Sequence, residues 1–233
     1  MAISIQIKLN EALYLRDPQE TKLGRRIIQN AILLIDELGF EHFTFKKLAE
    51  RIDSTEASVY RYFENKHLLL VYLLSWYWEW IKFRIIYKTT NIQDPAERLR
   101  TALATVVDAS LPDPTIEFVH QEVLHRIVIA EAIKTYRTKS VDAENKKGFF
   151  LTYKSLCRVI ADIISEINPD FAYPRALAFT LLEMSNDHIY FAEHLPSLTD
   201  ITIVKGDLEP VKQLLEAFAF GILQKQAPES TNS

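Results

Sequence analysis

Apolar residues recur at helical spacing along almost the whole chain, and this pattern restricts the fold more than any other feature. Residues three and four positions apart form stripes such as Ile27, Ala31, Leu34 and Leu38, which fall on one face of an α-helix. Glycine occurs only five times and never in a cluster, so the chain has no glycine-rich phosphate loop or dinucleotide fingerprint. The sequence therefore predicts an all-α protein.

Capping residues and prolines mark the ends of the predicted helices. Gly39 is placed to end a first helix over residues 21–38, and Thr44 is placed to begin a second, short helix. A third short helix follows, and a long fourth helix is expected over residues 67–88. Further helices are predicted over residues 95–110, 115–137 (either continuous or broken), 142–167, 174–195 and 210–223.

Charge and composition narrow the class of protein. Hydrophobic residues make up 48% and charged residues 25% of the chain, which is ordinary for a globular protein. The net charge of -4, from 27 basic and 31 acidic residues, excludes a polycation built for nucleic acid. A nucleic-acid site on this chain has to be local.

The cysteine content and the lack of long uninterrupted apolar segments indicate the cellular compartment in which we expect the protein. Cys157 is the single cysteine, which excludes an internal disulfide and favours a reducing compartment. Residues 1–9 lack the regions of a signal peptide, and their alternating isoleucines allow either a short strand or an ordered arm. Charged residues interrupt the most apolar stretch, 68–87, so we expect no membrane span and a cytoplasmic protein.

Two short helices separated by a break at residues 53–55 are typical of a helix-turn-helix. On the second of these helices, Val59 and Phe63 point inward, which leaves Ser58 and Arg61 on the opposite face. This outer face has small residues that allow entry into the major groove of DNA, and an arginine that can reach a guanine. The phenols that flank it, and that can hold phosphates, belong to Tyr60 and Tyr62.

The segment from Tyr60 to Leu69 carries a more specific signal. It reads Tyr-x-Tyr-Phe-x-x-Lys-x-x-Leu, and residues 20–70 as a whole resemble the N-terminal domain of the TetR (tetracycline repressor) family of bacterial regulators. The resemblance implies a homodimer that binds a palindromic operator in double-stranded DNA and usually represses transcription. It also implies release of the DNA when a small molecule enters a C-terminal helical bundle.

The resemblance also implies which residues touch DNA. The matching positions are Ser58, Tyr60, Tyr62 and Lys66, with phosphate contacts from Thr44 and Lys46. Arg61 is added to this set from its outward direction alone. Asp53 stands where the family usually has glycine, and aspartate tolerates a left-handed turn better than most residues. Glu56 would cost electrostatic energy beside phosphates unless it accepts from a cytosine amino group. Residues 42–67 carry a net charge of only +1, so we expect few phosphate contacts and modest non-specific binding.

An aromatic stripe on the long fourth helix favours an effector pocket in the bundle. The predicted lining comprises Trp76, Trp80, Phe83, Glu122 and His125, and the alternative is that the aromatic residues only pack the core. The Glu-x-x-His spacing of Glu122 and His125 occurs in di-iron bundles, but two further glutamates on facing helices are not identifiable. The sequence therefore predicts no metal and no cofactor.

The last two predicted helices are apolar on more than one side. A helix of this kind buries both faces, and in the TetR family these two helices pair with their twins, so we expect a homodimer through residues 174–195 and 210–223. The alternative is that they close only the core of the monomer. The predicted domains are an arm (1–20), the DNA-binding domain (21–67), the effector-binding and dimerisation domain (68–224) and a disordered tail (225–233).

The sequence thus predicts a non-enzymatic, ligand-responsive transcriptional regulator whose long fourth helix acts as a lever between the domains. The alternative function is that of a helical-bundle ligand-binding protein or enzyme whose N-terminal unit does not bind DNA.

Overall fold

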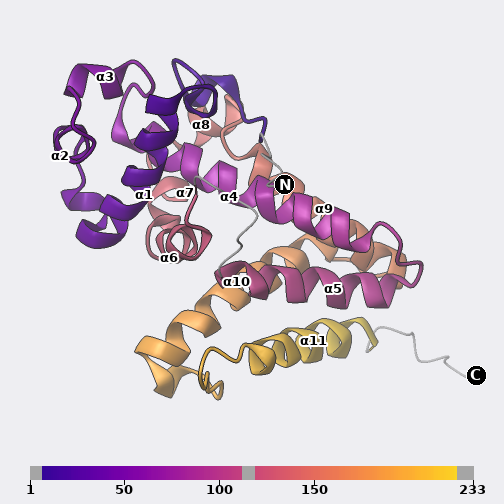
Figure 1. Ribbon diagram of the computed structural model, residues 1–233. Helices are drawn as coiled ribbons and strands as arrows, with labels where there is room; N and C mark the ends of the chain where they lie inside the picture. Colours follow the sequence, from indigo (N-terminus) through magenta and orange to yellow (C-terminus); the bar gives the residue numbers. More distant parts are fainter. Residues whose placement is uncertain (1–6, 112–118, 225–233) are drawn as a thin grey trace, which may run out of the picture. The chain divides into compact units, whose positions relative to one another are not determined.

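The computed structural model describes residues 7–111 and 119–224. All regular secondary structure in these two ranges is helical (Figure 1), as predicted. The predicted helix start at Asp113 and Pro114, the first six residues and the tail 225–233 lie outside the described residues. None of the described helices is both long enough and apolar enough to cross a membrane.

The chain forms two compact units. The first comprises residues 1–80 and 109–154, and the second comprises residues 81–108 and 155–233. Two helices, α4 (Lys66–Thr89) and α9 (Leu151–Ile167), begin in the first unit and end in the second. The helix-turn-helix shares its unit with helices that come much later in the sequence, and the domain boundary near residue 67 stays a prediction.

Helix α4 is the central element of the first unit. It is buried on every side from Leu69 to Trp78, as expected for a helix that is apolar all round. Helix α6 packs along α1 in the same unit. Besides the beginning of α4, the α-helices are α1 (Lys22–His42), α2 (Phe45–Arg51), α3 (Glu56–Tyr60), α6 (Gln121–Glu131), α7 (Ile133–Tyr136) and α8 (Val141–Lys146).

Threonine caps set the start of each of the first three helices. The Oγ1 atoms of Thr21, Thr44 and Thr55 accept backbone N–H groups at 2.9, 3.2 and 3.3 Å, which satisfies a donor that the first turn leaves free. Asp53 adopts a φ of 48° in the turn between α2 and α3, so aspartate does take the left-handed conformation expected of it. Gly39 has a φ of 73° and interrupts α1 where the sequence predicted the helix to end. A short helical turn then continues to His42.

The N-terminal arm is an ordered part of the first unit and contains no strand in its described residues. It forms two 3₁₀ turns, Glu11–Leu13 and Pro18–Glu20. The side chain of Gln19 pairs with both backbone groups of Ile7, at 3.2 and 2.7 Å. A Cβ on Gly24 would lie 2.3 Å from the carbonyl oxygen of Pro18, so only glycine allows the arm to approach α1 this closely.

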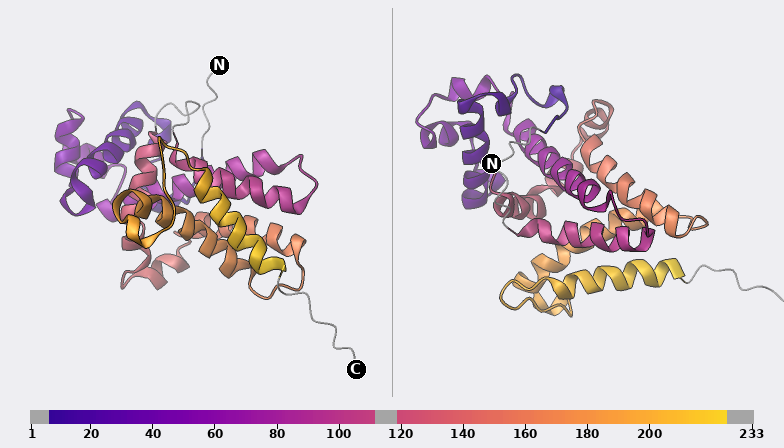
Figure 2. Two further views of the ribbon diagram at one scale, coloured as in Figure 1. Left: turned by 90° about the horizontal axis from the view of Figure 1, so that it is seen from below. Right: turned by 45° about the vertical axis from the view of Figure 1, so that its right-hand side comes forward.

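The second unit is built from the end of α4, the rest of α9 and three further helices. These are α5 (Pro95–Val107), α10 (Pro174–His194) and α11 (Glu209–Gln224). Helix α11 packs along both α5 and α10, which the two views of Figure 2 show within this unit. A contact of the Arg100 guanidinium with the Phe220 ring, at 4.7 Å, and an ion pair of Lys212 with Asp108, at 2.9 Å, join α11 to the α5 segment.

The prediction of one helix over residues 142–167 is wrong. The segment forms α8 and α9 with a break between them, where Gly148 has a φ of 80°. An L-residue rarely adopts this conformation, so the glycine ends the helical geometry. In contrast, the helices predicted over 174–195 and 210–223 are confirmed as α10 and α11.

Candidate DNA-binding surface and internal polar site

Helix α3 has one buried and one exposed face. Val59 and Phe63 are fully buried, and Ala57, Tyr60 and Arg61 are exposed. Tyr60 retains 47% of its side-chain exposure while its ring contacts Phe45 edge-on at 5.0 Å. The outer face of α3 therefore has the small residue, the arginine and the phenol on its surface. Ser58 is half-buried, and its hydroxyl lies 2.9 Å from that of Thr55.

Tyr62 does not flank this outer face, and its prediction as a surface phenol is wrong. The side chain is 2% exposed, and its hydroxyl is bonded to Thr21 Oγ1 at 2.7 Å. The physical reason is that α3 ends at Tyr60, so the helical spacing used for the prediction does not extend to residue 62. Tyr62 instead holds the start of α1 against the end of the helix-turn-helix.

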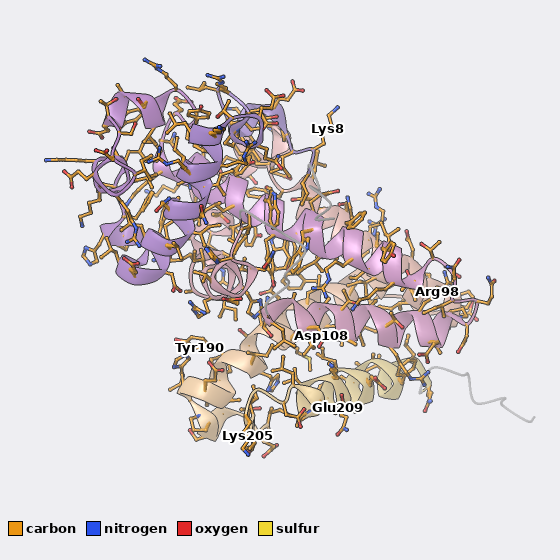
Figure 3. The ribbon with its side chains drawn as sticks, viewed as in Figure 1. Lys8, Arg98, Asp108, Tyr190, Lys205 and Glu209 are labelled. Atoms are coloured by element: carbon orange, nitrogen blue, oxygen red, sulfur yellow. The ribbon has the colours of Figure 1, made fainter. Side chains whose placement is uncertain are left out.

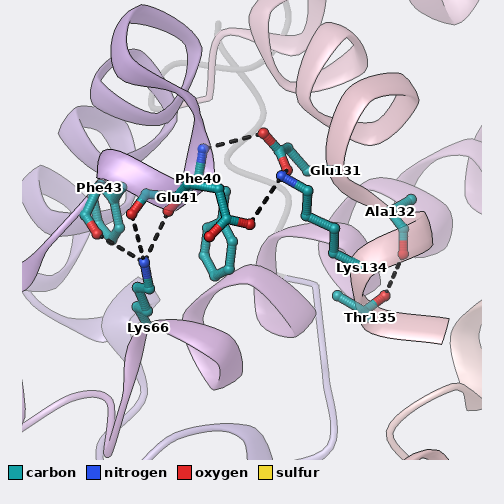
Figure 4. A network of polar contacts seen from close by, with 8 residues as sticks. All are labelled: Phe40, Glu41, Phe43, Lys66, Glu131, Ala132, Lys134 and Thr135. Atoms are coloured by element: carbon teal, nitrogen blue, oxygen red, sulfur yellow. Dashed lines mark hydrogen bonds and ion pairs between the residues drawn. The ribbon is translucent and has the colours of Figure 1, made fainter. Parts of the chain in front are cut away.

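The ammonium group of Lys66 is also occupied within the chain. It donates to the backbone oxygens of Phe40, Glu41 and Phe43 at 3.0, 3.1 and 3.2 Å (Figure 4). These carbonyls lie at the C-terminal end of α1, where the helix dipole favours a cation. The structure thus gives Lys66 a structural role, and its contact with DNA stays a prediction.

We predict that Lys66→Met lowers the free energy of unfolding by about 2 kcal/mol, since hydrogen bonds from a charged group contribute about 1.5–3 kcal/mol. Lys46→Met is the matched control, because Lys46 is exposed and surface substitutions usually change stability by less than about 0.5 kcal/mol. Urea denaturation of the two variants measures the difference. Equal stability of the two variants would refute the structural role of Lys66.

Other basic residues of the first unit divide into occupied and open groups. Lys46 belongs to the open group, since it is exposed at the start of α2 beside the exposed Thr44. Arg25 and Arg26 donate to the backbone oxygens of Gln19 and Ile52, so they serve the fold and are not free to reach DNA. Arg51 forms a bidentate ion pair with Glu37, at 2.5 and 2.8 Å.

Charged contacts connect α6 and α7 to the last part of α1. Arg126 pairs with Asp36 through two bonds, at 3.0 and 2.7 Å. Glu131 accepts the N–H of Phe40 at 3.1 Å (Figure 4). Lys134 lies 2.7 Å from Glu131 and 3.2 Å from Glu41. The contacts of Arg126 and Glu131 with α1 span about 90 positions of the sequence, and local patterns do not predict them.

The residues predicted to line an effector pocket do not form one group. Trp76 and Trp80 are 1% exposed and stack on each other at 6.3 Å, so both lie in the core of the first unit. Phe83 is 45% exposed on α4, and its place in an effector pocket stays a prediction. Glu122 is only half-buried.

His125 lies in the interior of the first unit, bonded to a phenol. Its Nδ1 is 2.5 Å from the hydroxyl of Tyr77, and its side chain is 3% exposed. Burial, with a smaller effect from the Arg126 charge, lowers the pKa of His125 to about 4. The imidazole is therefore neutral at neutral pH.

Gln121, which the sequence analysis did not select, shares the buried face of α6 with His125. It is 3% exposed. The signal was present, since Gln121, Leu124, His125 and Val128 follow the spacing of an amphipathic helix. Glu122 lies next to this stripe and not on it, which explains why the Glu-x-x-His spacing selected the wrong partner for His125.

The described residues hold no group of three or more potential metal ligands among histidine, cysteine, aspartate and glutamate. Cys157 is a free, half-buried thiol, and burial raises its pKa to about 11. At neutral pH this thiol is protonated and therefore a poor nucleophile.

Comparisons with known proteins show which proteins have a similar sequence segment and a similar fold. The model of the tetR family of bacterial regulatory proteins matches residues 27–73. No curated protein sequence matches this chain. Among solved structures, AibR in complex with isovaleryl coenzyme A and operator DNA has a TM-score of 0.58 at 17% identity, covering 83% of this chain and 97% of AibR.

Two further solved structures are similar over a comparable length. FadR from Bacillus subtilis in complex with stearoyl-CoA has a TM-score of 0.58 at 15% identity, over 85% of this chain and 95% of FadR. The superantigen PfiT has a TM-score of 0.56 at 13% identity, over 86% of this chain and 94% of PfiT. Because one fold here carries differently described functions, similarity at these identities establishes the fold alone.

The three N-terminal helices, with their turn at Asp53 and the exposed face of α3, define a helix-turn-helix DNA-binding protein of all-helical fold. Residues 27–73 match the model of the tetR family of bacterial regulatory proteins, so the chain carries the N-terminal domain of that family.

Proposed function

We propose that this regulator is a repressor that binds a palindromic operator as a homodimer and releases it when a small molecule binds the helices beyond the helix-turn-helix. The observation that carries this proposal is the exposed face of α3. Ala57, Tyr60 and Arg61 lie on that surface while Val59 and Phe63 fix the helix from beneath. Such a helix fits the major groove.

The proposed DNA contacts follow from exposure and chemistry. Arg61 is the base-reading residue because an arginine forms bidentate hydrogen bonds with guanine. Tyr60, Thr44 and Lys46 hold phosphates, and Ser58 adds a hydroxyl near the groove. Tyr62 and Lys66 are left out because their polar groups are bonded to Thr21 and to the end of α1.

Selection from random duplex DNA at two salt concentrations tests the proposed function. We expect an enriched palindrome with half-sites about one helical turn apart, 34–36 Å. Affinity should fall with salt by about 0.9 in the logarithmic slope for each phosphate that the protein neutralises. Absence of an enriched sequence would favour the alternative of a ligand-binding protein without DNA binding.

Arg61→Ala is expected to relax specificity at one base pair of each half-site, at a cost of about 1–3 kcal/mol per contact. The control is Lys46→Ala, which should weaken binding to all sequences alike and reduce the salt slope by about 1. Competition binding with operators changed at single positions measures both effects. Uniform weakening by Arg61→Ala would assign this arginine to the DNA backbone instead.

The proposed dimer forms through the exposed side of α10 and α11. On α11, Val211 and Leu215 are buried within the unit, but Phe218 and Ile222 remain 49% and 39% exposed. On α10, Phe179 is 49% exposed. A Cβ on Gly221 would meet nothing within 4 Å, so this position leaves room for close approach of a second copy. Tyr190 of α10 extends this surface toward the loop that contains Lys205 (Figure 3).

Effector binding is proposed to reach the DNA-binding helices through α6. The bidentate pair of Arg126 with Asp36 and the bond from Phe40 to Glu131 fix α6 against α1. A shift of α6 therefore biases the position of α1, and coupling of this kind is typically about 1–3 kcal/mol. AibR and FadR were solved with isovaleryl coenzyme A and stearoyl-CoA, so acyl-coenzyme A thioesters and the uncharged acyl compounds related to them are the first to test.

A further inference from the structure

Two polar side chains on the buried face of α6 have donors that nothing in the described chain accepts. The Nε2 atoms of Gln121 and His125 are both buried and have no hydrogen-bond partner, and each side chain is 3% exposed. The two residues are four positions apart and therefore neighbours on one face of the helix. A buried, unsatisfied donor costs about 1–3 kcal/mol, so two adjacent ones indicate a place where an acceptor binds.

The bond between His125 and Tyr77 determines what the free ring nitrogen offers. The Tyr77 hydroxyl and Nδ1 of His125 lie 2.5 Å apart. We assign the hydroxyl as the donor, because a phenol is a stronger acid than the N–H of a neutral imidazole. The single proton of the neutral ring then lies on Nε2. Gln121 and His125 consequently present N–H donors side by side.

The surroundings restrict the chemistry of the acceptor. Both donors are neutral, and Tyr77 is flanked on the same buried helix by Trp76 and Trp80. Burying a carboxylate in an apolar interior without a cation costs far more than burying a neutral carbonyl.

We propose that Gln121 and His125 form an internal binding site for the carbonyl oxygen of a neutral, otherwise apolar small molecule, with α4 supplying aromatic walls. The consequence for DNA release rests on the proposed function, since α6 also carries Arg126 and Glu131, which contact α1. The binding itself does not depend on DNA.

The test uses the full chain without DNA and a pair of probes of equal shape. 2-Pentanone presents a carbonyl oxygen, and 2-methyl-1-pentene replaces that oxygen with a methylene group. The readout is the ¹⁵N chemical shift of His125 Nε2, assigned by its loss in His125→Phe. We expect a saturable shift with the ketone and binding at least about tenfold weaker for the alkene, which corresponds to one lost hydrogen bond.

Two variants and one further probe complete the experiment. Gln121→Leu should weaken binding of 2-pentanone about tenfold while His125 still responds. Equal binding of ketone and alkene, or no shift with either, would overturn the proposal, and both ligands are compared on the unsubstituted chain. Tighter binding of pentanoate than of 2-pentanone would overturn the neutral class of ligand. Because no DNA is present, failure here leaves operator selection as an independent result.

Discussion

Phe218→Asp is expected to convert the regulator from a dimer into monomers and to lower its operator affinity by at least about 100-fold. Phe218 is 49% exposed on the outer side of α11, where the proposed interface brings two copies together. In a symmetric dimer the substitution buries two unpaired carboxylates, each at a cost of several kcal/mol. A loss of 1.4 kcal/mol already weakens binding tenfold.

Sedimentation velocity measures the oligomeric state, and titration of the selected operator measures the affinity. Tyr87→Asp is the matched control. Tyr87 is an aromatic residue of the same unit and is 76% exposed, but it lies on α4, which is not a helix of the proposed interface. The control should remain dimeric. A Phe218→Asp protein that stays dimeric with unchanged operator affinity would show that α11 closes only the core of the monomer.

Local signals in the sequence predicted most of the helices. A threonine side chain caps the first turn after Thr44, and the aspartate of Asp94-Pro95 accepts the N–H groups of Ala96 and Glu97. Such bonds lie within three residues, so the sequence contains everything that determines them. The break at Gly148 had a local signal too, since an isolated glycine lowers helix stability, but the surrounding apolar spacing concealed it.

Contacts between distant segments were not predictable in the same way. Tyr62 and Lys66 match DNA-contacting positions of the TetR family, yet their hydroxyl and ammonium groups bond to Thr21 and to the end of α1. These partners are 41 and 23–26 residues away. Spacing along one helix indicates which side chains share a face, but only the packing of the first unit decides which of them reach solvent.

The proposed site at Gln121 and His125 contains one feature that the sequence could predict and one that it could not. Periodicity along α6 places Gln121 with His125, so the proposed pair was accessible to sequence reasoning. The contact of His125 with Tyr77, 48 residues earlier, was not accessible, because it depends on how α6 and α4 meet. The same contact sets the tautomer of His125 and with it the chemistry of the site.

Acidification is expected to destabilise the protein through His125. The pKa of this histidine is about 4 in the folded chain, against 6.5 as its ordinary value. The unfolded chain therefore binds a proton between these two pH values while the folded chain does not, and stability falls as the pH falls. The loss begins near pH 6.5, reaches about 2 kcal/mol near pH 5 and levels off at about 3 kcal/mol below pH 4.

Urea denaturation of the wild type and of His125→Gln across this pH range isolates the contribution of the histidine. Glutamine retains a polar side chain but does not titrate, so the variant should lose about 2 kcal/mol less than the wild type between pH 7 and pH 5. Carboxylates elsewhere in the chain affect both proteins equally and cancel in the difference. Parallel stability curves would mean that His125 takes up its proton in the folded state near its ordinary pKa. That result is incompatible with a neutral imidazole that is buried against Tyr77.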